Sequence, residues 1–146
     1  MPYTIQQVAR MTGIPSSTLR YYDKEGLLPF LGRSAAGYRM FSDLDLAMLQ
    51  VLQCLKKTGM PVSDMKRFTE WVRQGDATLR QRHEMFIGRR EAVERQIAEL
   101  QKALAVIDHK CEYYRKAVKA GTEKHLRGKD KLPCADEFLT PLKSAI

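Results

Sequence analysis

The sequence predicts a mainly α-helical chain, in which a winged helix-turn-helix domain is followed by a long coiled-coil dimerisation helix. Two observations support this fold class. Residues 4–26 contain two short amphipathic helical patterns joined by a Gly-containing turn, and a Pro- and Gly-containing stretch follows at residues 29–41. Residues 77–119 contain no Pro and one Gly, and they carry a sustained apolar 4-3 repeat, which is typical of a coiled coil.

The first two helices form the predicted helix-turn-helix. Thr4 is a good N-cap residue, and three apolar residues after it share one helical face before Gly13 ends the helix. The second helix starts near Pro15, where we expect the hydroxyl of Ser16 to cap it, and it ends at Gly26. This second helix occupies the place of a recognition helix.

The next segment is expected to be a wing, followed by two more helices. Residues 29–41 have apolar residues at both ends and turn residues between them, which favours a short β-hairpin. Ser42 is expected to cap a helix over residues 43–58. Pro61 suits the first turn of a further helix that ends near Gln74.

The long helix is expected to dimerise. Counting four and then three residues from Leu79 gives twelve positions, of which ten are apolar or Cys, whereas His83 and Arg90 interrupt the repeat near its start. At 1.5 Å per residue the helix would be about 60 Å long, and one small domain could not cover its apolar stripe. The simplest partner is the same helix of a second subunit, so we expect a homodimer. The predicted dimerisation residues are Phe86, Val93, Ile97, Leu100, Leu104, Ile107 and Tyr114.

Composition restricts the function classes. The 146 residues carry a net charge of +8, which favours a polyanionic partner such as nucleic acid. The three cysteines match no disulfide scaffold or zinc motif, so neither a metal nor another cofactor is expected. GxSxG, HExxH and P-loop motifs are missing from the sequence, which argues against an enzyme. Without a signal-peptide pattern or an apolar run of about 18 residues, we expect a cytoplasmic protein with no membrane partner.

These patterns divide the chain into three predicted regions. Residues 1–75 form a winged helix-turn-helix DNA-binding domain, and residues 76–120 form the dimerisation helix. Residues 121–146 are basic at first and then contain two prolines, which predicts a loosely ordered tail with a short helix at 135–140.

Candidate DNA contacts lie on the second helix and on the wing. Small hydroxyl residues at the start of a recognition helix can approach phosphates and base edges closely, and an arginine there can read guanine bidentately. Wing arginines can hold the flanking backbone or the minor groove, although solvated loop arginines are an alternative. Of the two adjacent tyrosines, one is expected to face the core and the other to offer its hydroxyl. The candidates are Thr4, Ser16, Ser17, Thr18, Arg20, Tyr21, Tyr22, Arg33, Tyr38 and Arg39.

Several short motifs together resemble the MerR family of bacterial regulators. They are Val8-Ala9, Thr18-Leu19-Arg20-Tyr21-Tyr22, Gly26-Leu27-Leu28-Pro29, Gly37-Tyr38-Arg39 and the sequence LKKTGMPVSDM at 55–65. The resemblance implies an antiparallel coiled-coil homodimer on pseudo-palindromic, double-stranded promoter DNA. It also implies that the protein bends and untwists an overlong promoter spacer for RNA polymerase holoenzyme. Phe41 departs from the tyrosine usual in the family, so no hydroxyl contact is inferred there.

Cys54 is the candidate sensor. On a helical wheel centred on Leu44 it falls at the edge of the core face, and Lys57 one turn later would favour its thiolate. The alternative is a small buried hydrophobe. The surrounding residues resemble the AdhR- and NmlR-like branch, which implies sensing of aldehydes, other electrophiles, or nitrosative or oxidative stress through this thiol.

Other effectors and other functions are also considered. No cysteine opens the long helix, and Cys111 and Cys134 are 23 residues apart, which disfavours a thiolate metal site. A MerR-type regulator with a non-covalent small-molecule or metal effector remains an alternative to covalent sensing. A non-regulatory architectural DNA-binding protein is a further alternative, because it would use the same basic surface.

Overall fold

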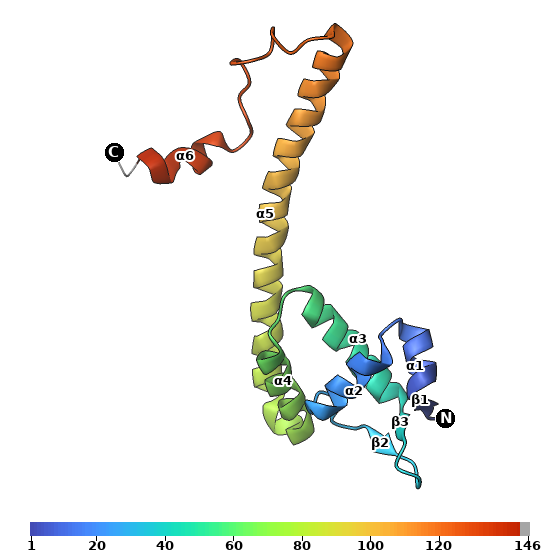
Figure 1. Cartoon of the computed structure of the whole chain (residues 1–146). Coiled ribbons are helices and arrows are strands. Elements are labelled where there is room, and N and C mark those ends of the chain that lie inside the picture. Colours follow the sequence, from blue (N-terminus) through green and yellow to red (C-terminus); the bar gives the residue numbers. More distant parts are fainter. Residues whose placement is uncertain (144–146) are drawn as a thin grey trace. The chain divides into compact units, whose positions relative to one another are not determined.

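The computed structural model describes residues 1–143 (Figure 1). The chain forms two compact units, Met1–Gly88 and a second unit that begins at Arg89. The first unit holds helices and a small sheet, and the second consists of helices and the segment that connects them. Each unit is described separately below.

The first unit is a winged helix-turn-helix, as the sequence predicts. A three-stranded antiparallel sheet, in the order β1-β3-β2, accompanies its helices. Strand β1 was not expected from the sequence, because its two residues are too short for a recognisable alternation; Tyr3 pairs with Phe41. The elements are β1 (Tyr3–Thr4), α1 (Ile5–Thr12), α2 (Ser16–Lys24), β2 (Gly32–Arg33), β3 (Arg39–Phe41), α3 (Asp43–Lys57), α4 (Val62–Gln74), a 3-10 turn (Gly75–Thr78) and the start of α5 (Leu79–Ala120).

Two of the three predicted helix caps are confirmed. The hydroxyl oxygens of Thr4 and Ser42 accept hydrogen bonds from backbone N–H groups three residues later, and both residues form capping boxes. The prediction for Ser16 is wrong: it is the first residue of α2, and Pro15 is the N-cap, without a side-chain bond. The carbonyl of Pro15 already accepts from the N–H of Leu19, so the helix begins one residue earlier than the hydroxyl would require.

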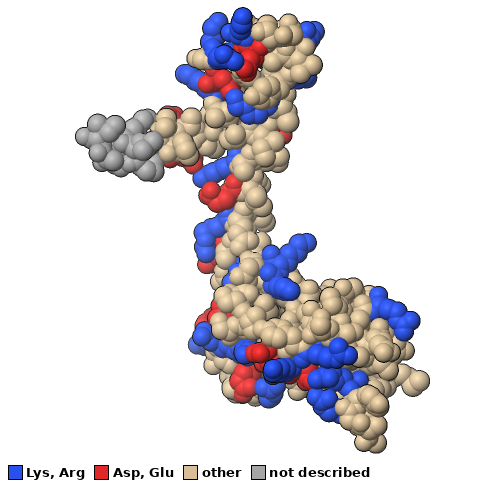
Figure 2. All heavy atoms as spheres, viewed as in Figure 1, with Lys and Arg blue, Asp and Glu red and all other residues tan. Residues whose placement is uncertain are grey.

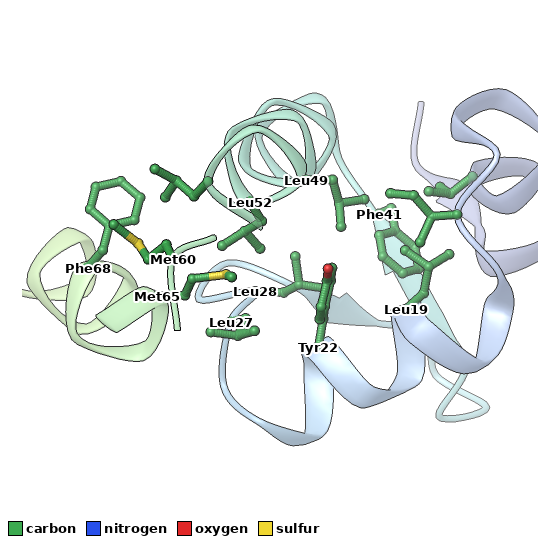
Figure 3. Close-up of a cluster of buried hydrophobic side chains, with 13 residues drawn as sticks. Leu19, Tyr22, Leu27, Leu28, Phe41, Leu49, Leu52, Met60, Met65 and Phe68 are labelled. Atoms are coloured by element: carbon green, nitrogen blue, oxygen red, sulfur yellow. The ribbon is translucent and has the colours of Figure 1, made fainter. Parts of the chain in front are cut away.

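Helix α3 supplies the centre of the core of this unit (Figure 3). Leu49, Leu52 and Leu55 are buried, whereas Leu44 is 66% exposed. The helical wheel therefore includes Leu52 and Leu55 correctly, but its centre on Leu44 is wrong. Leu44 lies five residues before Leu49, which is a rotation of about 140° at 3.6 residues per turn. The capping box places Asp45, not Leu44, on the buried side, where its carboxylate accepts hydrogen bonds from Ser42.

The first turns of α5 belong to the first unit. The rings of Phe68 on α4 and Phe86 on α5 meet edge to face, with centroids 5.3 Å apart. Met85 also packs against the core. Phe86 is therefore partly covered by its own chain, which leaves it 39% exposed.

The second unit contains the remainder of α5 and helix α6 (Ala135–Lys143). Between these helices the chain folds back along α5: Asp130 accepts a hydrogen bond from Lys110 at 2.6 Å and pairs with His109. The Lys110 ammonium, and then His109, hold the pKa of the Asp130 carboxyl below its usual range. Lys102 also pairs with Glu137 at 2.8 Å, which ties α6 to α5.

In the predicted C-terminal tail, the structure shows turns and irregular backbone over residues 121–134 and a helix from Ala135. Opposite charges on α5 and on the connecting segment hold them together, and no local pattern in the sequence shows this pairing. The predicted helix at 135–140 is confirmed and extends to Lys143. Residues 144–146 of the predicted tail lie outside the described residues.

The register of α3 predicts the effect of two leucine truncations. Leu52→Ala should lower the free energy of unfolding by about 2–5 kcal/mol, because it leaves a cavity in the core. Leu44→Ala on the same helix should change it by less than about 0.5 kcal/mol, because that side chain is exposed. Urea denaturation followed by circular dichroism measures both. Equal losses for the two variants would contradict the observed helix face.

Candidate nucleic-acid interface

Helix α2 has one buried face and one exposed face. Leu19 and Tyr22 are buried, whereas Ser17, Arg20 and Tyr21 are exposed. The candidate contacts at the start of the helix therefore lie on the side away from the core. This is the arrangement that a recognition helix requires.

The structure separates the roles of the two adjacent tyrosines. Tyr22 is 3% exposed, and its hydroxyl accepts a hydrogen bond from the Gln53 side chain of α3 at 2.9 Å. Tyr21 is 44% exposed, so its ring and hydroxyl are accessible from solvent. In Figure 3 the Tyr22 ring lies among the core side chains, with its oxygen towards α3.

Lys56 is a candidate contact that the sequence analysis did not single out. It lies at the end of α3 and lines a pocket together with Ser17, Thr18 and Tyr21 of α2. Met60, Val62 and Met65 form the apolar floor of this pocket. Since Lys56 lies 32 residues after Lys24, the last residue of α2, only the packing of α3 against α2 brings its charge to this surface.

The wing is a short hairpin with an exposed tip. The N–H of Ser34 donates to the Tyr38 carbonyl at 2.8 Å, and the Ser34 hydroxyl accepts from the N–H of Tyr38. Gly37 has a φ of 85°, a value that the turn needs and that other residues rarely adopt. The Tyr38 side chain is 73% exposed at this tip.

Both predicted wing arginines bind the same acidic residue of α2. Arg39 Nε donates to Asp23 Oδ2 at 2.6 Å, and Arg33 Nη2 donates to the same oxygen at 2.9 Å. Asp23 is a functional candidate that the sequence analysis missed, because it lies 10 and 16 residues from its partners. Figure 2 shows basic side chains gathered over the N-terminal unit, with fewer acidic ones between them.

Helix α4 is attached to the end of α2. Lys66 forms an ion pair with Glu25, and the hydrogen bond to this carboxylate raises the pKa of the Lys66 ammonium. The Thr69 hydroxyl donates to the Gly26 carbonyl at 3.3 Å. A displacement of α4 would therefore act directly on the C-terminal end of α2.

Two further candidates, Thr4 and Cys54, do not belong to the exposed face of α2. The Thr4 hydroxyl is the acceptor of its capping box, at the start of α1. Cys54 is exposed, which corrects its expected position at the edge of the core. It lies two residues after the buried Leu52, a rotation of about 200°, and so it points away from the core.

The structure offers no metal centre or membrane span in the part of the chain that it describes. No group of three or more His, Cys, Asp or Glu side chains among residues 1–143 could hold a metal ion. No described helix is both long enough and apolar enough to cross a membrane.

Comparison with known proteins identifies the family. The family model described as MerR HTH family regulatory protein matches residues 3–70. An HTH-type transcriptional regulator of Haemophilus influenzae is 46% identical over 124 residues, which cover 85% of this chain and 92% of the relative. The regulator AdhR of Bacillus subtilis is 29% identical over 87 residues, covering 60% of this chain and 62% of AdhR.

Solved structures give the same result. The crystal structure of HiNmlR, a MerR family regulator lacking the sensor domain and bound to promoter DNA, is 46% identical, with a TM-score of 0.79. The match covers 86% of this chain and 99% of HiNmlR. A MerR family regulator of Bacillus thuringiensis is 40% identical, with a TM-score of 0.71, covering 77% of this chain and 98% of that one. The chain belongs to the MerR family of helix-turn-helix transcriptional regulators.

Proposed function

We propose that this MerR-family regulator acts as a homodimer on double-stranded promoter DNA, with α2 in the major groove and the wing on the flanking backbone. The observation that carries the proposal is the exposed face of α2, where Ser17, Arg20 and Tyr21 lie together. Hydroxyl groups suit phosphates, and an arginine suits phosphate or guanine. The similarity to HiNmlR, whose structure contains promoter DNA, supports the same partner for this chain.

Each remaining candidate contact has a place in this arrangement. Ser16, Thr18 and Lys56 would contact phosphates at the start of the recognition helix. Tyr38, Arg33 and Arg39 would contact the backbone beside it. Tyr22, which is buried, would contribute mainly by holding α2 on α3. Thr4 would act at the start of α1, where its hydroxyl already serves the helix cap.

The exposed apolar residues of α5 support dimerisation. Ile97, Leu100, Leu104 and Ile107 are each at least half exposed in the single chain. Burial of one such side chain stabilises an assembly by about 1.5–3 kcal/mol, so a continuous row of them favours pairing with a second copy. We propose an antiparallel pair of α5 helices as the contact, with residues 1–75 binding DNA, 76–120 dimerising and 121–146 as a C-terminal extension.

The dimer would act by remodelling DNA. A two-fold protein binds two half-sites at once, so a change in the orientation of its DNA-binding domains bends and untwists the spacer between them. We propose that this change realigns the promoter for RNA polymerase holoenzyme in the cytoplasm. Because α4 is bonded to the end of α2, a shift of α4 is a direct way to reorient the recognition helix.

We further propose that Cys54 senses a reactive electrophile or nitrosative or oxidative stress. Its thiol is exposed, so an aldehyde or nitric-oxide donor can reach it. It lies on α3 between Gln53, which bonds to Tyr22, and the end of the helix that leads into α4. A modification there would disturb the Gln53–Tyr22 hydrogen bond, and it would also disturb α4, which is bonded to the end of the recognition helix. The similarity to AdhR supports this branch of the family.

Arg20→Ala should weaken DNA binding. The loss of a bidentate contact to guanine costs about 1–3 kcal/mol per half-site and should relax the sequence preference at that base pair. Fluorescence anisotropy with a duplex selected by the wild-type protein from a random pool measures the affinity. Arg95→Ala, which removes the same charge from the outer side of α5, serves as the control. Equal affinities for both variants would contradict the proposed role of α2.

Footprinting separates regulation from coating of DNA. A regulator of this kind should protect one two-fold site near a promoter, whereas an architectural protein would protect DNA continuously.

Leu100→Asp should convert the dimer into a monomer, because it places a charge in the apolar contact of α5. Ala98→Asp introduces the same side chain on the outer side of the helix and should leave the dimer intact. Sedimentation velocity at micromolar concentration gives the mass of each variant. If the Leu100→Asp variant stayed dimeric, the dimer contact could not be the apolar row of α5.

Cys54→Ser should abolish the promoter response to aldehydes and nitric-oxide donors while DNA binding persists. Cys111→Ser and Cys134→Ser are matched controls, because those thiols are also exposed. A promoter-reporter assay measures the response, and mass spectrometry of the treated protein locates the adduct. An adduct confined to Cys111 or Cys134 would rule out Cys54 as the sensor. A full response in Cys54→Ser without any adduct on the protein would favour a non-covalent or metal effector.

A further inference from the structure

The wing contains a repulsive pair of charges. Arg33 on β2 and Arg39 on β3 are direct partners in the antiparallel register. Like charges at directly opposed positions destabilise a strand pair. Each of these strands has only two or three residues, so few ladder hydrogen bonds oppose the repulsion. A negative charge between the two guanidinium groups would relieve this repulsion.

Asp23 supplies that charge from the recognition helix. One carboxylate oxygen accepts from both arginines, at 2.6 and 2.9 Å. Its side chain is only 18% exposed, and that of Arg39 is 26% exposed, so water screens the pair less than at an open surface. Arg33 also donates to the Gly37 carbonyl at 3.3 Å, which extends the same network to the turn of the wing.

We propose that Asp23 is a positioning residue for DNA binding, because its carboxylate fixes the wing to the recognition helix so that both can meet the DNA together. Asp23 itself contacts no DNA in this proposal. The inference rests on the proposed DNA-binding function and adds a residue to it. An acidic group near a polyanion normally weakens binding, so by simple electrostatics the removal of Asp23 should raise the affinity for DNA. The positioning role predicts the opposite, a lower affinity.

Asp23→Asn is the decisive variant. If Asp23 positions the wing, this variant should bind the selected duplex about tenfold more weakly than the wild-type protein, although its net charge is more positive. Asp23→Glu should recover part of the affinity. Asp43→Asn, which makes the same change at an exposed position of the same unit, should bind as tightly as the wild type or more tightly. Affinity in Asp23→Asn equal to or above that of the wild type would overturn the proposal.

A second measurement reports on the wing without DNA. A nitroxide attached to Ala36→Cys, in a chain whose three native cysteines are replaced by serine, reports motion at the exposed wing tip. Asp23→Asn should increase this motion, and Asp23→Ser serves as a second variant if circular dichroism shows that the first is unfolded. The wild-type spectrum should persist in Asp43→Asn. Unchanged motion in a folded Asp23 variant would overturn the proposal.

The two measurements separate this inference from the proposed function. A wild-type protein that selects no DNA sequence would overturn both. Intact wild-type binding together with unaffected binding by Asp23→Asn would overturn only the role of Asp23.

Discussion

The packing of α3 against α2 and α4 around one core is the constraint on which the rest of the DNA-binding unit depends. Leu49 and Leu52 of α3 are fully buried against side chains of α2 and α4, as Figure 3 shows. This contact fixes which side of α2 faces outwards. It also determines that Tyr22 meets Gln53, that Lys56 lies beside the start of α2, and that Cys54 faces solvent. The candidate site is therefore a consequence of the core.

Electrostatics at this surface does more than attract DNA. The two wing arginines repel one another across the strands, and the one carboxylate of Asp23 makes their arrangement stable. The charges that would bind phosphate are thus held in place before DNA arrives, which lowers the conformational entropy lost on binding. A net charge of +8 favours a polyanionic partner. The position of single acidic side chains such as Asp23 determines where the basic side chains point.

Helix α5 obeys a different constraint. Its first turns pack on α4 through Phe86 and Met85, but farther along the helix apolar side chains are left at the surface of the single chain. Such a row is stable in water only when another apolar surface covers it. The C-terminal segment forms ion pairs with Lys102, His109 and Lys110 along the same stretch of α5, whereas Leu104 and Ile107 stay more than half exposed.

The sequence by itself determined the helices, the wing and the family, because these depend on local signals: caps, turn glycines and apolar periodicity. It also placed the exposed apolar row on α5. Tertiary structure alone decided which tyrosine is buried, which face of α3 forms the core and which charges meet. Asp23 and the wing arginines are 10 and 16 residues apart, and Asp130 lies 20 from Lys110. Contacts at such separations depend on how whole elements pack, and no periodicity in the chain encodes them.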